Sequence, residues 1–569
     1  MNGGSLNTLL RYVNTARYLK TGQIVSQLKR CVAASSPESL MSIAVPEYEG
    51  LNPPSMSPIP PKVAGMNRTD ILNGVFSFQN KRLNIGSPPD WYFQNAPALW
   101  LYNLHYHDVL WLLDYPEAKA ITSHWIQNYL PEKGKTGWDP YPVSIRIQNW
   151  AGLFFAKYQR EIGEDIEFRN LLWKSICRQL HWLSRNLEYH LLANHLLENA
   201  IALSVCGHLF KGAPAQTWRR IGEAVLVREL TEQILPDGMH FERSPMYHLR
   251  MLHALMNLAI YLNGALKHNV LNVIGKMLRP AMEFTHPDGE IALLNDSAFN
   301  VYPESTVLRD AYANRFAEDK GELPDERERR CGVFMYPDTG YYGVNDSGGV
   351  YLIIDAAPIG PDYNPGHAHG DIFSFELSLN RSRFIVDSGV FDYDIGEMRE
   401  FCRSTRAHNT VEIEQKDQCE FWGSFRVARR GYPRDVDADH TESSFSISGW
   451  HDGYERLRYR PRHFRSMTWD FTSQCLAIDD RIAAAKAVKA ASRLHVTPDA
   501  GLLKETAREI IIHAPAGKIQ ISVSGDAQLS VEKSVFCPEF GKKEENMVVV
   551  IRGSGSNIFW QTLIRKLTS

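Results

Sequence analysis

The sequence predicts an α+β protein in which helices come first and strands come second. From about residue 98 to about residue 325, apolar residues recur at helical spacing, and short segments rich in Pro, Gly and Asp separate the runs. From about residue 333 onward, short β-branched runs alternate with turn residues. The 569 residues exceed one ordinary hydrophobic core. We therefore expect two large domains, one helical and one of strands.

The helical domain is predicted to occupy residues 98–330 and the strand domain residues 331–569. Many consecutive helices with short loops indicate a bundle, a solenoid or a helical barrel. No fixed-period repeat is visible, which weakens the solenoid interpretation. The candidate helices span residues 101–114, 116–130, 143–161, 165–186, 188–210, 214–235, 246–266 and 269–284.

Residues 1–97 form a separate N-terminal part with three segments. Residues 5–34 carry apolar side chains at three- and four-residue spacing, which predicts an amphipathic helix. Residues 35–65 are rich in Pro and Ser, which indicates a linker or an extended arm around the body. Residues 71–94 alternate and turn as a short β-hairpin does.

Composition excludes several classes of protein. The net charge of −3 gives no electrostatic basis for binding nucleic acid. No run of about 18 apolar residues is present, so no transmembrane helix is expected. The first 30 residues lack the apolar core of a signal peptide, which favours a cytoplasmic location, with periplasmic location or non-classical export as alternatives. The oligomeric state stays open. The cysteines form no CxxC pair, which argues against a disulfide framework and against a cysteine zinc site. They are Cys31, Cys177, Cys206, Cys331, Cys402, Cys419, Cys475 and Cys537.

A histidine-rich stretch begins the candidate chemistry. His367 and His369 lie two residues apart, so on a strand their imidazoles would face the same side. Asp387 and His408 lie near the ends of later strand-like runs, and antiparallel pairing would bring them alongside. Two imidazoles and a carboxylate suit zinc or a similar divalent ion with a position left open. The alternative is that the histidines are polar loop residues and that Asp387 caps a turn.

The helical part carries three further candidate segments. Asn194 and His195 precede Glu198 by about one turn at the start of an apolar helix, where Asn194 is alternatively a helix cap. Tyr247 falls in the first turn after Pro245, where its hydroxyl either carries chemistry or simply bonds a backbone carbonyl. The third segment, Trp138–Trp150, places two tryptophans around Arg146. That layout suits a sugar and its carboxylate, or equally plain helix packing.

Together these pieces resemble the heparinase II/III-like polysaccharide lyases, including the related oligoalginate lyases. The resemblance covers about residues 90–425, and the all-β tail also fits. It implies an incomplete (α/α) toroid followed by an antiparallel β-sandwich, with the substrate cleft between them. Five segments in matching order carry it: Trp138–Trp150, Asn194–Glu198, Asp237–His248, His367–Gly389 and Arg406–Thr410.

The resemblance implies cleavage by β-elimination next to a uronic acid. The C6 carboxylate must be neutralised, a base must take the C5 proton, and an acid must protonate the leaving oxygen. The resemblance assigns Asn194, with His195, to the carboxylate. It assigns Tyr247 to acid–base work and His367 to the role of base or partner of Tyr247. A nearby cation such as Arg243 would help to activate the tyrosine.

The resemblance also implies a structural divalent metal, zinc by preference, held by His369, Asp387 and His408. The partner that it implies is an acidic polysaccharide. Residues 1–65 do not fit the secreted lyases, so we expect a bacterial protein that acts on the cell's own envelope or capsule polysaccharide. The expected substrate-binding residues are Trp138, Arg146, Glu198, Glu242, Arg243 and Arg406.

Two other functions compete with the lyase hypothesis. The run from His367 to Asp371 partly matches the HxHxDH motif of metallo-β-lactamase-like hydrolases, but Ile372 stands where that motif has His. The chain is alternatively a catalytically silent glycan-binding protein in polysaccharide assembly. A glycosidase is disfavoured because it needs two carboxylates that face one bond, whereas the candidates are Asn, Tyr and His.

Overall fold

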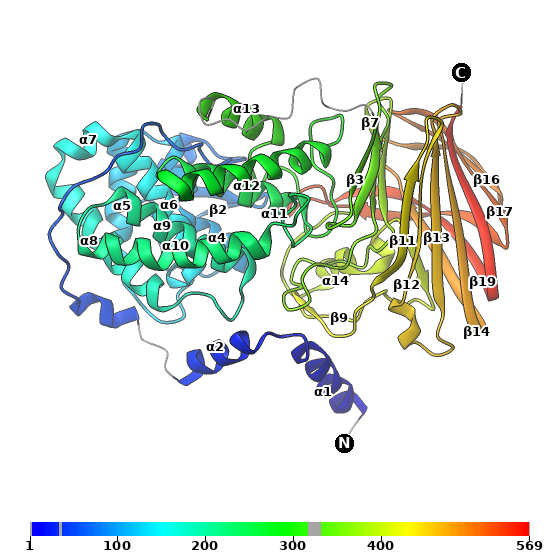
Figure 1. Ribbon diagram of the computed structural model, residues 1–569, viewed down its shortest axis with the longest axis horizontal. Helices are drawn as coiled ribbons and strands as arrows, with labels where there is room; N and C mark the ends of the chain where they lie inside the picture. The colour runs from blue at the N-terminus through cyan, green and yellow to red at the C-terminus, as the bar shows by residue number, and fades with distance from the viewer. Residues whose placement is uncertain (1–2, 33–36, 317–331, 568–569) are drawn as a thin grey trace.

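The computed structural model describes residues 3–32, 37–316 and 332–567. Helices fill one half of the molecule and antiparallel strands fill the other, as Figure 1 shows. The predicted order of helices first and strands second is therefore confirmed. Of the predicted helical part, residues 317–330 lie outside the described residues.

The helices of this half follow one another with short connections, as predicted. Four of the predicted helices are clearly shorter than expected: α4 ends at Tyr106, α6 passes into a π turn at Leu153–Lys157, α9 begins only after a loop at 187–192, and α11 ends before 260. A later helix, α13, had no predicted counterpart. The bounds are α4 Ala98–Tyr106, α5 Tyr115–Asn128, α6 Pro140–Gly152, α7 Gln159–Glu164, α8 Ile166–Arg185, α9 Ala193–Leu209, α10 Ala213–Gln233, α11 Pro245–Ala259, α12 Gly264–Glu283 and α13 Ser305–Arg315.

Helix α9 lies at the centre of the helical half. Nearly all its side chains are buried, including polar ones such as Asn199 and Ser204. A helix that is apolar on every side has neighbours all round, and α6, α10 and α11 pack against this one. By contrast, α8 keeps one apolar stripe, with Phe168, Leu172 and Ile176 inward. The first residues of α9 are therefore fixed by the core of the helical half.

Two antiparallel sheets form the other half. The smaller sheet has the order β3-β4-β5-β6-β7, and the larger has the order β11-β12-β13-β14-β19-β17-β16-β15, with β8 on β14 and β18 on β19. A short helix, α14 (Glu397–Arg403), interrupts the strands and was not predicted. The strands are β3 Gly332–Tyr336, β4 Tyr341–Asn345, β5 Tyr351–Asp355, β6 Phe375–Leu379, β7 Ser382–Ile385, β8 Val411–Ile413, β9 Phe421–Trp422, β10 Arg426–Val427, β11 Pro433–His440, β12 Ser444–His451, β13 Arg462–Asp470, β14 Cys475–His495, β15 Gly501–Glu505, β16 Glu509–Ala514, β17 Gly517–Gly525, β18 Ala527–Phe536 and β19 Glu544–Lys566.

The smaller sheet is buried on both faces. Successive residues of a strand point to opposite sides, and every residue of β5 is buried. Leu352 and Ile354 join the core shared with the larger sheet, whereas Tyr351 and Ile353 join a second core with Phe284 from the end of α12. The two sheets therefore form a sandwich whose smaller sheet is also the layer against the helices.

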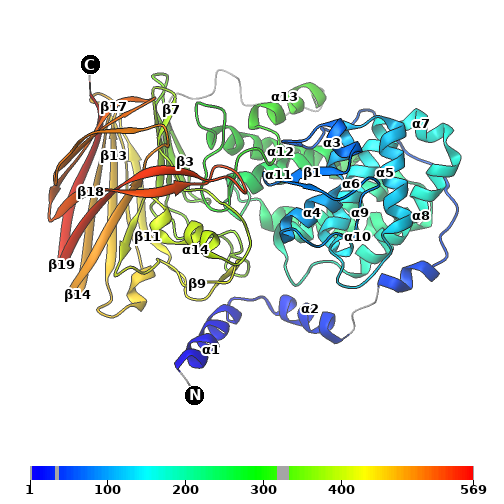
Figure 2. The same cartoon turned by 180° about the vertical axis from the view of Figure 1, so that it is seen from behind.

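The N-terminal part wraps the outside of the body. The helix expected over residues 5–34 is two helices, α1 (Gly3–Ala16) and α2 (Thr21–Val32), and both views in Figures 1 and 2 place them below the rest of the molecule. The predicted arm lies on the helical half, where the Ile59 N–H donates to Asn257 at 2.7 Å. A short helix, α3 (Arg68–Leu72), follows the arm. The predicted hairpin is confirmed, because β1 (Val75–Phe78) and β2 (Lys81–Asn84) pair antiparallel.

Candidate functional site

Tyr247 and His367 meet between the two halves of the molecule. Tyr247 lies in the first turn of α11, where its backbone N–H donates to the Ser244 hydroxyl that caps the helix. His367 lies in the long connection between β5 and β6. The two rings stack at 3.9 Å between centroids, and the Tyr247 hydroxyl lies 3.2 Å from that of Tyr393. Burial, reinforced by Tyr393, raises the pKa of Tyr247 well above its ordinary value, so the hydroxyl keeps its proton.

Asp296 fixes the orientation of His367. Its carboxylate lies 2.9 Å from His367 Nδ1 and 2.8 Å from His369 Nε2, and its backbone N–H donates to the His367 carbonyl. Burial alone would raise the pKa of Asp296, but Arg399 and the two imidazoles hold it well below the usual range. A carboxylate on Nδ1 leaves Nε2 as the nitrogen free for chemistry. That nitrogen lies 3.9 Å from a carboxylate oxygen of Glu242.

Asn194 lies on the same Glu242. Its side-chain amide donates to the two carboxylate oxygens at 2.9 and 3.1 Å, and both residues are buried. The start of α9 is strained, because Leu192 and Ala193 have φ values of 63° and 52°. Left-handed conformations at such residues cost on the order of 1–3 kcal/mol and occur mainly at functional sites. Asn194 is therefore a positioned side chain and does not cap the helix with its own amide.

His195 is more exposed than the other candidate histidine, His367, whose side chain is 13% exposed. The His195 side chain is 29% exposed, and its ring lies against Tyr141 at 4.4 Å between centroids. Nδ1 lies 3.0 Å from the buried carboxylate of Glu188. Burial opposes the charged ring, but Glu188, Glu242 and Glu198 together raise the pKa of His195. His195 thus offers a protonated Nε2 beside Asn194.

We name Asn194, His195, Glu242, Tyr247 and His367 the interdomain cluster. The contacts above link Asn194 through Glu242 to His367 and Tyr247, and His195 follows Asn194 in the first turn of α9. All four predicted catalytic residues belong to it. The cluster holds two donors for an anion and two groups for proton transfer.

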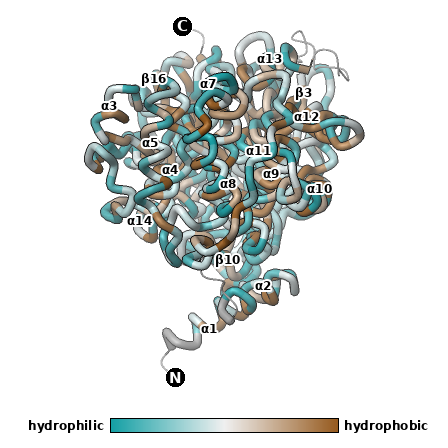
Figure 3. The backbone as a smooth tube through the Cα atoms, turned by 90° about the vertical axis from the view of Figure 1, so that its left-hand side faces the viewer, coloured by the Kyte–Doolittle hydropathy of each residue, from teal (hydrophilic) through white to brown (hydrophobic). Residues whose placement is uncertain are grey.

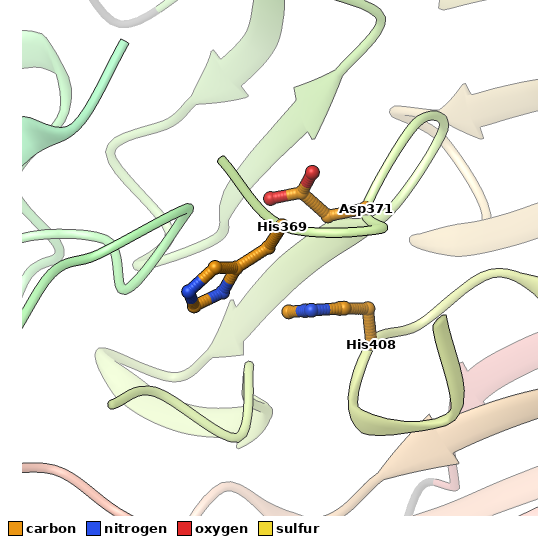
Figure 4. A group of neighbouring side chains, drawn as sticks. All are labelled: His369, Asp371 and His408. Atoms are coloured by element: carbon orange, nitrogen blue, oxygen red, sulfur yellow. The ribbon is translucent and has the colours of Figure 1, made fainter. Parts of the chain in front are cut away.

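A second cluster lies next to it in the β half. His369, Asp371 and His408 offer ligand atoms within 4.8 Å of one another, and Figure 4 shows the three side chains together. His369 Nδ1 and His408 Nε2 are buried without a hydrogen-bond partner. A buried imidazole nitrogen without a partner is costly unless it binds something, so this site fits a divalent metal.

Asp387 takes a different position from the predicted one. Its carboxylate lies 2.7 Å from His408 Nδ1, which is the nitrogen opposite the unpartnered Nε2. Among the described residues, the carboxylate grouped with the two histidines is Asp371. In this arrangement Asp387 orients His408, as a carboxylate behind a ligating histidine commonly does.

Comparison with known proteins identifies the family. The profile for the heparinase II/III N-terminus matches residues 101–320, and the profile described as heparinase II/III-like, C-terminal, matches residues 328–561. The chain belongs to the heparinase II/III family. The resemblance drawn from the five motifs is confirmed.

This heparinase II/III family member is similar to heparin-sulfate lyases. It is 25% identical over 312 residues to the one from Pedobacter heparinus, a match that covers 50% of this chain and 45% of that protein. It is 22% identical over 514 residues to the one from Bacteroides thetaiotaomicron, covering 79% and 69%. The match therefore spans about half the length of the first of these relatives.

A crystal structure of heparinase III has the same fold. It is 17% identical to this chain, with a TM-score of 0.68, and the match covers 85% of this chain and 80% of that one. The predicted fold, an incomplete (α/α) toroid followed by an antiparallel β-sandwich, is thereby confirmed. That fold also excludes the architecture of metallo-β-lactamase-like hydrolases.

Two residues predicted to bind substrate belong to the core of the toroid in this family member. The guanidinium of Arg146 is fully buried and donates to Gln179 and to the carbonyls of His105 and Gly137. Trp138 is 5% exposed and packs on Trp125. The prediction that these two residues bind substrate is wrong, because the flanking tryptophans mark helix packing.

The roles of Arg243 and Glu198 also differ from prediction. Arg243 donates to the carbonyls of Thr339 and Asp338, so it ties α11 to the β3–β4 turn and does not activate Tyr247. Glu198 is fully buried and accepts a hydrogen bond from Arg250 at 2.7 Å. Both side chains are held by protein partners.

Arg406 stays a prediction as a substrate residue. It is exposed, with its guanidinium 5.5 Å from the ring of Phe401.

Sequence reasoning missed Asp296, which contacts His367 and His369, and Arg250, which pairs with Glu198. Arg250 follows Tyr247 by three residues on α11, a spacing that places both on one side of the helix and that could have revealed it. Its guanidinium lies 5.4 Å from the ring of Tyr302. Asp296 lies in a loop with no motif, so only the structure shows it beside both histidines.

Proposed function

We propose that this chain is a lyase that cleaves a uronic-acid-containing polysaccharide by β-elimination. The observation that carries the proposal is the stacked pair of Tyr247 and His367, one from each half, with Asn194 and His195 beside them. Elimination needs an anion-binding group, a base and an acid within reach of one sugar ring. The interdomain cluster supplies all three. A glycosidase would need two free carboxylates, but Glu242 is bonded to Asn194 and Glu198 is paired with Arg250.

His195 and Asn194 would bind the uronate carboxylate. The protonated His195 supplies the positive charge, and its exposure allows a substrate to approach Nε2. The Asn194 amide donates to the Glu242 carboxylate, so it would exchange that acceptor for the uronate carboxylate when substrate binds. Charge on the substrate carboxylate grows as the C5 proton leaves, so these donors act most strongly in the transition state.

His367 and Tyr247 would divide the two proton transfers. His367 takes the C5 proton at Nε2, because Asp296 occupies Nδ1 and stabilises the imidazolium that results. Tyr247 gives its proton to the departing glycosidic oxygen, because burial keeps the hydroxyl protonated. The C4–O bond breaks as the C4–C5 double bond forms, which leaves an unsaturated sugar on one product.

A divalent metal would be held by His369, Asp371 and His408, with Asp387 behind His408. A bound ion would supply a rigid link between the β5–β6 connection and the segment after α14. His367 is two residues from His369 and shares Asp296 with it, so the same segment also orients the base.

The named relatives guide the choice of substrate. Both are heparin-sulfate lyases, so glycosaminoglycans are the first uronate polymers to test, followed by alginate-like and cell-envelope polymers. The cytoplasmic location and the envelope substrate stay predictions.

An absorbance screen tests the proposal. Purified protein is incubated with each uronate polysaccharide while ultraviolet absorbance is followed, since the unsaturated product absorbs and a hydrolysis product does not. We expect absorbance to grow with at least one polymer and to stop growing in the Tyr247→Phe variant. Binding of a polymer without any growth in absorbance across the panel would favour the silent glycan-binding alternative.

A further inference from the structure

Helices α1 and α2 lie outside the two halves of the molecule. Both front and back views place α1 beneath the strands and α2 beneath the helices, and Figure 3 shows the pair projecting from the body. Residues 3–32 therefore form a surface layer, which we call the strap.

The inner side of the strap is attached to both halves. On α1, the Thr15 hydroxyl accepts a hydrogen bond from the Trp422 indole at 3.0 Å. On α2, the buried Gln23 amide donates to the carbonyl of Tyr363 in the β half at 3.2 Å, and to the carbonyl of His190 in the helical half at 3.5 Å.

Ring contacts add to this attachment, since Tyr12 lies 4.8 Å from Trp422 between centroids and the Arg430 guanidinium lies 3.5 Å from the Tyr18 ring. A groove lined by Lys29, among others, separates α2 from α10.

The outer side of the strap is apolar. Leu9 and Val13 on α1 are 56% and 58% exposed, and Leu28 on α2 is 61% exposed. Leu9 precedes Val13 by four residues, and Ile24 precedes Leu28 by four, so each pair lies on one side of its helix. Leu10 is also exposed. Scattered apolar residues are normal on a protein surface, but two successive helices that each expose such a pair are a contact surface.

All charged residues of the strap are basic. The strap carries five basic residues and none of the 65 acidic residues of a chain whose net charge is −3. The five are Arg11, Arg17, Lys20, Lys29 and Arg30. Some are anchored to the body, as Arg11 is to Glu420 at 3.2 Å, but all five are exposed.

We propose that the strap binds the surface of an anionic lipid bilayer. Helices that combine exposed leucine and valine with lysine and arginine lie in the plane of the membrane interface, with the apolar side chains inserted and the cations at the lipid phosphates. In the described residues, no helix is long and apolar enough to span a bilayer, so the contact is interfacial. An acidic polysaccharide would use the cations but not the leucines. A second copy of the chain would use the leucines but would oppose like charges.

Membrane contact through the strap would also orient the interdomain cluster. Tyr363, which Gln23 contacts, lies four residues before His367 in the same connection. The strap therefore contacts the same β5–β6 connection that carries His367. This inference does not rest on the proposed function.

Vesicle flotation with the full-length protein tests the inference. The probes are vesicles of phosphatidylcholine alone and vesicles of phosphatidylcholine with phosphatidylglycerol. We expect the protein to float with the anionic vesicles and to be released by high salt. The double variant Leu9→Asp/Leu28→Asp should bind these vesicles at least about tenfold more weakly, because two inserted side chains are lost.

A matched control is Leu503→Asp, which changes an equally exposed leucine (57%) on the edge strand β15. It should float like the wild type, and all variants should keep the wild-type melting temperature. The inference is overturned if the wild type stays unbound to anionic vesicles, or if the double variant binds as well as the control. It is also overturned if the wild type is a dimer that the double variant dissociates, since the leucines would then serve a second copy.

Discussion

Replacing Tyr247 by Phe removes one hydroxyl from the interdomain cluster and leaves the ring in place. The ring stacks on His367 at 3.9 Å, and this contact needs no hydroxyl. The hydroxyl itself lies 3.2 Å from the Tyr393 hydroxyl, a bond between neutral groups. Losing such a bond costs about 0.5–1.5 kcal/mol of stability. We therefore expect a folded protein with a melting temperature close to that of the wild type.

The effect on the rate should be much larger. A positioned general acid contributes about 10²–10⁴-fold. That range corresponds to about 3–5 kcal/mol in the activation free energy, which exceeds the expected loss of stability. Because the change removes an interaction that matters in the transition state, kcat should fall while KM changes little.

The assay follows ultraviolet absorbance on the polymer that the screen identifies, with thermal melts in parallel. Tyr393→Phe is the matched control, since it removes the other hydroxyl of the same pair and leaves that of Tyr247. We expect the control to keep most of its activity. A Tyr247→Phe enzyme that retains more than about a tenth of the rate would exclude Tyr247 as the acid.

Four further predictions concern the charge on His195, the pH dependence of stability, the metal site and the division between the halves. Replacing Glu188 by Gln removes the carboxylate on His195 Nδ1 and so lowers the pKa of His195; the alkaline limb of the kcat/KM profile should move to lower pH, and an unmoved limb would show that His195 does not supply the charge. The folded-state pKa of His195 is raised, so the stability that the pair contributes should be lost as pH rises through the pKa of His195. The folded-state pKa of Glu188 is lowered, so the same stability should be lost as pH falls through the pKa of Glu188. Thermal melts across pH measure both losses. Replacing His408 by Ala should lower both the metal content, measured by elemental analysis, and the melting temperature; metal-free wild-type protein whose stability a chelator leaves unchanged would argue against the metal. Residues 98–316 expressed alone should show no lyase activity, because His367 lies in the other half, and any elimination product from this fragment would refute an interdomain site.

The order of helices and strands could be read from the sequence, because apolar residues recur at helical spacing in the first part and in short β-branched runs between turns in the second. Alternation and turn residues marked the β-hairpin of β1 and β2, and it formed where predicted. The N-terminal helix was too long in the prediction, since residues 17–20 lie between α1 and α2. A periodic pattern indicates helix but does not locate such a break.

The candidate site was predictable only where a motif carries it. Tyr247, His367 and Asn194 were singled out because the motifs that contain them follow one another in the order typical of the heparinase II/III-like lyases. Arg146 was misassigned, because an arginine between two tryptophans has the same sequence signature in a core as in a sugar site. Asp296 was missed, since its position between the histidines depends on how a loop of the helical half meets the β half.

The third metal ligand shows the same limit. Spacing along the chain could not separate Asp371 from Asp387, because both carboxylates lie near His408 in space: Asp387 bonds Nδ1, whereas Asp371 is grouped with His369 and His408. Contacts across domains are fixed by tertiary packing, which one sequence does not display.

Cleavage in oxygen-labelled water tests elimination most directly. The enzyme is incubated with its uronate polymer in heavy-oxygen water, and the products are analysed by mass spectrometry. Elimination breaks the C4–O bond without adding water, so we predict one product with a C4–C5 double bond and no net gain of water across the two products. Saturated products that together have gained one labelled water would show hydrolysis and would contradict the roles given to His367 and Tyr247.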